Sequence, residues 1–264
     1  MVRVLSGAVL IAFAVAVVWL APPVLFFAVS QLVVVLGVWE YVSLSRSGGT
    51  DVPAWAAGLA AVATSASMAV GGGASMHVAA ALLGVLVVLG VVALVRWDGR
   101  PGALAQASSL VFPSLYLGLP IGALVAIRQR QGAAGLFLVM LTVIISDTAQ
   151  YYTGRALGRR PLAVTISPKK TLEGALGGFV AGALAFAAIG ARWWTPPPPV
   201  GVRLGLGVAI VAAGIAGDLF ESMLKRSAGV KDSSSLIPGH GGVLDRIDAL
   251  LFAAPVYFLA TVYL

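Results

Sequence analysis

Residues 77–95 read HVAAALLGVLVVLGVVALV, a run without Asp, Glu, Lys or Arg. A bilayer core about 30 Å thick needs roughly 20 apolar residues for each helical crossing, so this run is long enough to span it. Similar apolar runs fall at approximately 4–21, 23–44, 53–72, 106–127, 133–152, 173–191, 201–222 and 243–263. The sequence therefore predicts an all-α polytopic membrane protein with about nine transmembrane helices.

The composition supports this fold class and excludes several functions. Of the 264 residues, 59% are hydrophobic and 10% are charged, whereas soluble domains are about half apolar and a quarter charged. The chain has no cysteine, which excludes disulfides, cysteine-bound zinc and thiol catalysis. The net charge of +7 suits membrane topology and anionic lipid headgroups, so we expect a lipid bilayer and no nucleic acid as a partner.

The first apolar run follows Arg3 and resembles a signal peptide in that respect. However, Trp19, Leu20 and Ala21 make a poor small-x-small cleavage site, and another apolar run follows directly. We therefore expect a retained first helix.

Basic residues are distributed unevenly among the predicted loops. With nine spans, all but four of the seventeen lysines and arginines fall on the side of the N-terminus. The four exceptions are Arg128, Arg130, Arg192 and Arg203. By the positive-inside rule the N-terminus is cytoplasmic, and the C-terminus lies on the other side. The two longest polar connections, about 153–172 and 223–242, then both face the cytoplasm, where soluble metabolites can reach them.

Acidic residues collect in the second half of the chain. Seven of the ten lie between positions 147 and 248, namely Asp147, Glu173, Asp218, Glu221, Asp232, Asp245 and Asp248. Ionisable groups in or beside membrane spans are costly and usually face the protein interior or a water-filled cavity. We therefore predict a catalytic region at 131–264, and we assign 1–130, with about five helices, to a scaffold and to dimerisation.

Two acidic segments of this region are candidates for the chemistry. In 217–226, GDLFESMLKR, helical spacing puts one set of polar residues on a single face: Asp218, Glu221, Ser222 and Lys225. This set could instead be an internal salt bridge followed by a topological stop. In 245–248, DRID, two carboxylates three residues apart share a helical face and suit Mg²⁺. The alternative is that Asp245 favours the helix N-terminus while Asp248 pairs with Arg246.

Two polar loops are candidates for phosphate binding. Residues 231–242, KDSSSLIPGHGG, have glycines on both sides of His240, and backbone N–H groups in such a loop can bind phosphate oxygens. His240 itself could donate to phosphate, carry a proton or be structural. Residues 167–174, SPKKTLEG, could hold polyphosphate at the membrane surface or could anchor the topology.

Motifs of other enzyme classes are absent from the sequence. It contains no Walker A loop, kinase loop, GxSxG elbow, HExxH helix or zinc-ligand cluster. Acids, bases and glycines at one membrane face are typical of phosphoryl or nucleotidyl transfer, in which catalysis is largely positioning and charge neutralisation.

These segments together resemble the phosphatidate cytidylyltransferase family. The resemblance is carried by 222–226 (SMLKR), 231–232 (KD) and 238–248 (PGHGGVLDRID), which together look like the family signature at 222–248. Asp147, Tyr151 and Arg155, then 167–171 and 173–174, are similar to the motifs that precede it. The likeness covers roughly 140–264.

The resemblance implies roles for individual residues. It implies that Asp218 and Asp245 bind Mg²⁺, that a monovalent cation such as K⁺ can accompany it, and that the enzyme is a membrane-embedded homodimer. The implied catalytic residues are Asp218, Lys225, Arg226, Lys231, Asp232, His240, Asp245 and Arg246. The implied substrate-binding residues are Asp147, Ser167, Lys169, Lys170, Thr171, Glu173, Ser222, Gly239, Gly241, Gly242 and Asp248.

The implied reaction joins CTP to phosphatidic acid and gives CDP-diacylglycerol and pyrophosphate, at the cytoplasmic face of a bacterial inner membrane. A CTP-dependent polyprenol or phytol kinase is the closest alternative and would release CDP instead. A CDP-alcohol phosphotransferase would need an Asp-Gly-x-x-Ala-Arg motif, which the sequence lacks. An ion-coupled transporter would also have intramembrane Asp and Lys residues, but we find no inverted repeat. A non-catalytic scaffold would not need this set of acids and bases.

Overall fold

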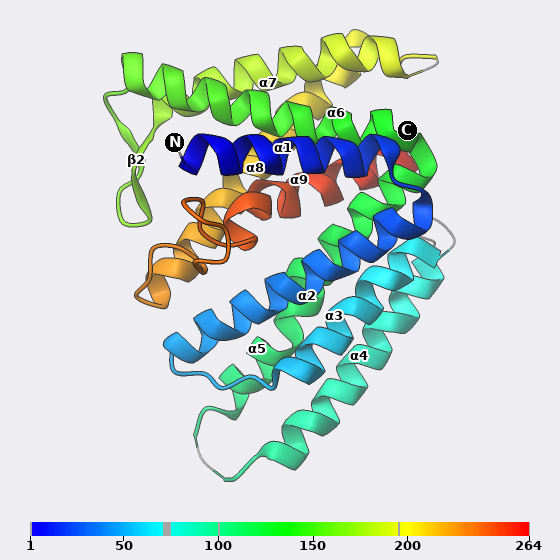
Figure 1. Cartoon of the computed structure of the whole chain (residues 1–264), viewed down its shortest axis with the longest axis vertical. Coiled ribbons are helices and arrows are strands. Elements are labelled where there is room, and N and C mark those ends of the chain that lie inside the picture. The colour runs from blue at the N-terminus through cyan, green and yellow to red at the C-terminus, as the bar shows by residue number, and fades with distance from the viewer. Residues whose placement is uncertain (1, 71–74, 100, 195, 264) are drawn as a thin grey trace. The chain divides into compact units, whose positions relative to one another are not determined.

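The computed structural model of the chain describes residues 2–70, 75–99, 101–194 and 196–263. Helices dominate it (Figure 1). In chain order they are α1 (Val2–Leu20), α2 (Pro23–Ser47), α3 (Ala54–Ala69), α4 (Ser75–Arg96), α5 (Ala103–Pro113), the π-helical turn η2 (Ser114–Gly118), α6 (Leu119–Leu157), α7 (Leu172–Trp193), α8 (Val200–Ser227) and α9 (Leu244–Tyr263). Their order and approximate positions follow the predicted apolar runs.

Five helical segments among the described residues are long and apolar enough to cross a membrane: Pro23–Ser47, Ser75–Arg96, Ala103–Leu157, Leu172–Trp193 and Val200–Ser227. Two shorter helical segments, Ser6–Leu20 and Ala54–Ala69, are also apolar. The chain is therefore an almost all-helical integral membrane protein. The number of crossings and the side of the N-terminus stay predictions.

The segment Ala103–Leu157 is too long for a single crossing. Its 55 residues would extend about 80 Å as one straight helix, far beyond a bilayer core of about 30 Å. Gly132, with φ 70° and ψ −168°, interrupts the helix within α6. The π-helical turn η2 directly follows Pro113, whose ring cannot fit a regular helix interior. The glycine lies where the sequence predicted a boundary between two spans.

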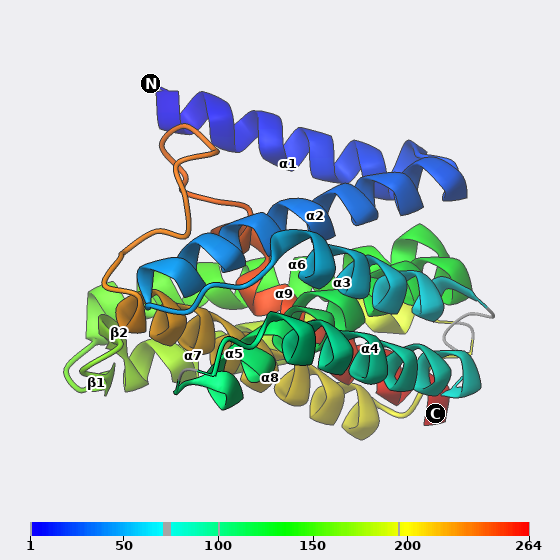
Figure 2. The same ribbon diagram turned by 90° about the horizontal axis from the view of Figure 1, so that it is seen from below.

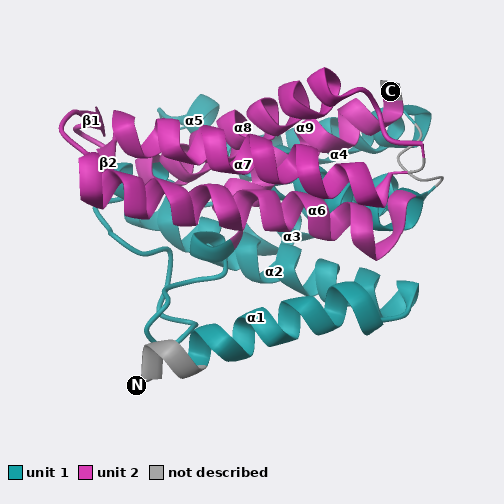
Figure 3. Ribbon diagram, turned by 90° about the horizontal axis from the view of Figure 1, so that it is seen from above, with its two compact units in different colours: residues 1–130, 224–246 teal, residues 131–223, 247–264 magenta. Residues whose placement is uncertain are grey.

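The chain divides into two compact units (Figure 3). Unit 1 comprises Met1–Arg130 and Leu224–Arg246, and unit 2 comprises Gln131–Met223 and Ile247–Leu264. The division at residue 130 coincides with the predicted start of the catalytic region. Most of the family-like segment at 222–248, however, belongs to unit 1 together with the N-terminal helices.

Unit 1 is a helical bundle held together by close backbone contacts. In it, α3 packs against α2, α4, α5 and η2. A Cβ on Gly118 would lie only 2.7 Å from the carbonyl oxygen of Ala61, so glycine is required for the α3–η2 contact. Gly37 of α2 likewise faces the methyl groups of Leu117 and Leu244, which brings the start of α9 against α2.

Unit 2 packs its helices through small residues as well. A Cβ on Gly207 of α8 would lie 2.7 Å from Cα of Ala183 on α7, and a Cβ on Gly217 would lie 2.5 Å from the carbonyl oxygen of Asp248 on α9. Small residues at helix crossings are typical of membrane proteins, because dispersion contacts between close backbones drive helix association in lipid.

Unit 2 also contains the antiparallel strands β1 (Pro161–Ala163) and β2 (Ser167–Thr171). The sequence interpretation treated 153–172 as a polar loop and did not predict this hairpin. Thr171 is β-branched and favours extended structure, but strands this short leave only a weak pattern. The hairpin lies directly between α6 and α7 (Figure 1).

Candidate functional site

Three of the predicted site residues meet within unit 2. Lys170 of β2 donates a hydrogen bond to the Asp218 carboxylate of α8 and forms an ion pair with it. Asp147 of α6 lies close enough for electrostatic interaction with both side chains. Gln150 orients Asp147 by donating from Nε2 to Oδ1 at 3.0 Å. The cluster of Asp147, Lys170 and Asp218 therefore combines two carboxylates with one ammonium group.

Glycines bring the elements of this cluster together. A Cβ on Gly174 would lie 2.8 Å from the carbonyl oxygen of Gln150, and a Cβ on Gly178 would lie 2.4 Å from Cγ of Gln150. Helices α6 and α7 therefore approach closely beside Asp147. Thr171 begins α7 as its N-cap and accepts a hydrogen bond from the backbone N–H of Gly174 at 3.1 Å. This cap fixes the end of β2, next to Lys170.

Glu173 accepts hydrogen bonds from the backbone near the start of the hairpin in unit 2. Its Oε2 accepts hydrogen bonds from the backbone N–H groups of Arg159 and Arg160, at 3.0 and 3.2 Å. These bonds tie the start of the hairpin to the first turn of α7. Its predicted role in substrate binding stays a prediction.

A second set of predicted residues meets within unit 1. Lys225, near the end of α8, forms an ion pair with Asp245 in the first turn of α9, and the two side chains are only 10% and 6% exposed. Asp245 Oδ2 also accepts hydrogen bonds from the backbone N–H groups of Ser233, at 2.9 Å, and of Gly242, at 2.8 Å. The Ser233 hydroxyl oxygen lies 2.8 Å from the same carboxylate oxygen. Asp245 therefore connects both helices to residues 228–243, which we call the α8–α9 loop.

The α8–α9 loop contains a tight turn around His240. The backbone N–H of His240 donates to the carbonyl oxygen of Ile237 at 2.9 Å, with Pro238 and Gly239 between them. Gly239 has φ 76°, so proline and a left-handed glycine occupy the central positions of a type II turn. The Nδ1 atom of His240 lies 2.9 Å from the Ser6 hydroxyl of α1. Figure 2 shows the loop reaching the N-terminal part of α1.

Glu40 is a functional candidate that the sequence interpretation missed. This residue of α2 is 0% exposed. Its carboxylate accepts hydrogen bonds from the hydroxyls of Ser233 and Ser234 and from the backbone N–H groups of Val243 and Leu244. A signal was available, because Glu40 is the only acidic residue of the apolar helix Pro23–Ser47 and ionisable residues within spans usually have a function.

The remaining predicted residues occupy the same two regions. In unit 2, Ser167 and Lys169 lie on β2, Ser222 on α8 and Asp248 on α9. In unit 1, Arg226 lies in the last turn of α8, Lys231 and Asp232 are exposed in the α8–α9 loop, and Arg246 is exposed at the start of α9. The same loop holds Gly239, Gly241 and Gly242.

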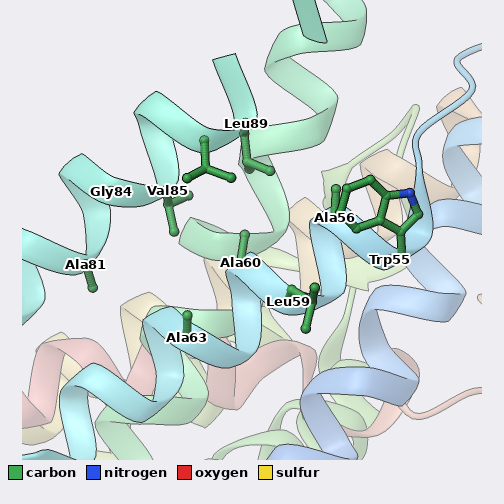
Figure 4. A pocket seen from close by; sticks show the side chains of 10 residues that line it. Trp55, Ala56, Leu59, Ala60, Ala63, Ala81, Gly84, Val85 and Leu89 are labelled. Carbon is green, nitrogen blue, oxygen red and sulfur yellow. The ribbon is translucent and has the colours of Figure 1, made fainter. Parts of the chain in front are cut away.

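A pocket in unit 1 lies elsewhere and is chemically unsuited to a nucleotide (Figure 4). It lies between α3 and α4, and no lining residue is charged. The lining residues are Trp55, Ala56, Leu59, Ala60, Ala63, Ala81, Gly84, Val85, Val88 and Leu89. Such a lining has no cationic side chain to offset the charge of phosphate oxygens, so we place the chemistry at the polar clusters.

The donor set of the unit 2 cluster fits Mg²⁺. This ion prefers oxygen ligands, keeps several waters and is usually held by one or two carboxylates together with substrate phosphates. Asp147 and Asp218 supply two carboxylates from two helices, with one lysine beside them. Among the described residues, no group of three or more His, Asp or Glu side chains is arranged to hold a metal ion. A site here would therefore depend on substrate oxygens.

Comparisons with known proteins find similarity to cytidylyltransferases. The sequence model of the Cytidylyltransferase family matches residues 1–264. The phosphatidate cytidylyltransferase of Helicobacter pylori strain J99 is 39% identical over 150 residues, which cover 57% of this chain and 55% of that protein. The Haemophilus influenzae protein of the same name is 48% identical over 132 residues, which cover 47% of this chain and 45% of that protein. The Pseudomonas aeruginosa protein of that name is 40% identical over 163 residues, which cover 61% of this chain and 58% of that protein. The match thus spans about half the length of these relatives.

Proposed function

The chain belongs to the cytidylyltransferase family, and from this premise we propose that it is a phosphatidate cytidylyltransferase. It joins CTP to phosphatidic acid and releases CDP-diacylglycerol and pyrophosphate. The names of the similar proteins support this reaction. The observation that carries the proposal is the cluster in unit 2, where Asp147, Lys170 and Asp218 converge from three separate segments of the chain.

The reaction is an in-line nucleotidyl transfer. A phosphate oxygen of phosphatidic acid attacks the α-phosphorus of CTP and forms a new P–O bond, while the bond to the β-phosphate breaks and pyrophosphate leaves. The attacking phosphate is already anionic near neutral pH, so no side chain has to become a nucleophile. The task of the protein is to hold two anionic reactants together and to offset charge on the leaving group.

The cationic side chains of the chain perform this task. Lys170 is fixed by Asp218 at the end of β2, which gives its charge a defined position for phosphate oxygens. Lys225 is fixed in the same way by Asp245 in unit 1. Lys169, Lys231 and Arg246 are exposed and can reach phosphates without first breaking a buried contact.

Asp147 and Asp218 would hold Mg²⁺, which when bound neutralises negative charge on the phosphates of CTP. Asp245, the other metal ligand that the family resemblance implies, is engaged with Lys225, Ser233 and Gly242. Its role in metal binding stays a prediction, as does an accompanying K⁺.

The finer assignments of location and assembly are part of the same proposal. The site faces the cytoplasm of a bacterial inner membrane, as the excess of basic residues on one side favours. The enzyme is a homodimer, as the family resemblance implies, and cross-linking in membranes tests this.

One incubation tests the reaction. Purified protein in lipid nanodiscs receives CTP, Mg²⁺ and phosphatidic acid, and mass spectrometry identifies the products. We expect CDP-diacylglycerol and pyrophosphate, loss of turnover with a chelator and recovery with Mg²⁺. Release of CDP with a phosphorylated lipid alcohol would show a kinase instead, and no product from phosphatidic acid would overturn the proposal.

A matched pair of variants connects the reaction to the site. Asp218→Asn should lower kcat/KM by about a hundredfold or more, a loss typical of removing one electrostatic contact in a transition state. Asp51→Asn makes the same chemical change at an exposed surface ion pair with Arg46 and Arg96, and its activity should stay unchanged. Equal activity of the two variants would remove Asp218 from the site.

A further inference from the structure

The carboxylate of Glu40 joins the two ends of the α8–α9 loop. Its Oε1 accepts from the Ser234 hydroxyl at 2.7 Å and from the backbone N–H of Val243 at 2.8 Å. Its Oε2 accepts from the Ser233 hydroxyl at 2.9 Å and from the backbone N–H of Leu244 at 2.8 Å. Each oxygen therefore binds one hydroxyl near the start of the loop and one amide at its end.

The surroundings of Glu40 leave little room for another arrangement. A Cβ on Gly242 would lie 2.4 Å from Oε1 of Glu40 and 2.1 Å from the Ser233 hydroxyl oxygen. The loop backbone thus passes directly against the carboxylate, and only glycine fits there. The Ser233 hydroxyl also lies 2.8 Å from Oδ2 of Asp245, so the contacts of Glu40 continue into the Lys225–Asp245 ion pair.

Fully buried acids are rare unless they are paired or hydrogen-bonded, since removing a charge from water is costly. Glu40 meets this requirement through the contacts named above, with residues 193 to 204 positions away in the sequence. Among the described residues, these contacts connect Glu40 to the loop and to Leu244, the first residue of α9, so an effect of Glu40 on the reaction would pass through this segment.

We propose that Glu40 is a positioning residue for nucleotidyl transfer, which holds the α8–α9 loop in the conformation that places His240 and the Lys225–Asp245 pair. The effect on the reaction rests on the proposed function, whereas the effect on the loop does not. An experiment can therefore reject the effect on the reaction without rejecting the effect on the loop.

The sharpest variant is Glu40→Gln, which keeps the size of the side chain. An amide has one acceptor oxygen, so either Val243 or Leu244 would direct its N–H at the new NH₂ group. The hydroxyls of Ser233 and Ser234 can rotate and adapt, but a backbone N–H cannot. The arrangement seen here would then no longer be the preferred state of the loop.

Hydrogen exchange measures the loop directly. In nanodiscs without substrates, exchange of the peptide containing Val243 and Leu244 should be slow in the parent protein and at least tenfold faster in Glu40→Gln. Ser30→Ala is the matched control, because Ser30 is a buried polar residue of the same helix whose hydroxyl donates within its own turn, to the carbonyl oxygen of Phe26. It should leave exchange unchanged.

Kinetics provide the second arm. Glu40→Gln should lower kcat/KM for CTP at least tenfold without lowering the amount of folded protein, and Ser30→Ala should not. Ser234→Ala removes one hydroxyl donor to Glu40 and should cause a smaller loss in kcat/KM. The double variant should lose less than the product of the two single losses, because both act through one contact.

The outcomes separate the possibilities. Unchanged exchange in Glu40→Gln would overturn the proposal, whatever the activity. If hydrogen exchange is faster in Glu40→Gln but the parent protein itself makes no CDP-diacylglycerol, loop positioning is supported and the proposed function is rejected. If Glu40→Gln does not fold, Ser234→Ala decides, since exchange at Val243 and Leu244 equal to that of the parent would overturn the proposal.

Discussion

Replacing Asp245 with Asn should destabilise the protein far more than replacing Asp218 with Asn. The Lys225–Asp245 pair has side chains 10% and 6% exposed, whereas the Lys170–Asp218 pair has side chains 24% and 27% exposed. Breaking a buried ion pair costs about 3–5 kcal/mol, because the remaining charge stays buried without its partner. Breaking an ion pair whose side chains have access to water costs roughly 1 kcal/mol.

The expected difference in unfolding free energy between the two variants is therefore about 2–4 kcal/mol in the same membrane mimetic. For a domain of this size, each kcal/mol lowers the melting temperature by roughly 2–4 °C, so Asp245→Asn should melt on the order of 10 °C below Asp218→Asn. Tryptophan fluorescence of the six native Trp residues reports the transition. A chelator is present throughout, so that bound metal does not contribute stability.

Two controls define the cause of the shift. Asp51→Asn removes an exposed partner of Arg46 and should have the same melting temperature as the parent protein. Lys225→Met combined with Asp245→Asn removes both charges and should recover part of the loss, because neutral replacements of a buried pair avoid the stranded ammonium group. Equal melting temperatures for Asp245→Asn and Asp218→Asn would refute the reasoning, and would mean that the buried pair does not support the fold.

Two further predictions concern orientation and phosphate binding. Single cysteines at Ser235 and Val262, introduced into this cysteine-free chain, should be labelled from opposite sides of the membrane, and labelling of both from one side would contradict the predicted topology. Lys169→Gln and Lys170→Gln should each lower kcat/KM for CTP by about tenfold to a hundredfold, the usual value of a hydrogen bond to a charged group, with the amount of folded protein unchanged. Unchanged rates for both would remove β2 from the site.

The helices could be predicted because the bilayer leaves few alternatives. A chain in lipid must satisfy its backbone hydrogen bonds internally, and each crossing needs a fixed length, so apolar runs define helices almost directly. Gly132 lies at the predicted boundary of two runs for this reason. The hairpin at 161–171 lies between such runs, where this constraint does not apply, and it was not predicted.

The candidate site could be predicted only in part. Lys170 and Asp218 were both selected from local motifs, but neither motif shows that the two side chains form an ion pair. Glu40 lies 193 residues from Ser233, and no local pattern encodes that hydrogen bond. The high number of acidic residues in the second half of the chain drew attention away from Glu40, whose carboxylate connects the α8–α9 loop to α2.

The glycines of the α8–α9 loop show how one residue type can be explained in two ways. From sequence they suggested exposed amides that bind phosphate. In the structure, Gly242 lets the backbone pass against Glu40, and its own amide donates to Asp245. The next two amides, of Val243 and Leu244, donate to Glu40.

Because these three amides already bond to carboxylates, we expect the cationic side chains of this region to make its phosphate contacts. Lys231 and Arg246 are exposed and extend from either end of the segment that Glu40 and Asp245 organise. A loop that is rigid in its backbone and cationic at its side chains suits a reaction in which charge must be offset at a fixed place. The acids that hold this loop would then contribute to catalysis without contacting the substrates.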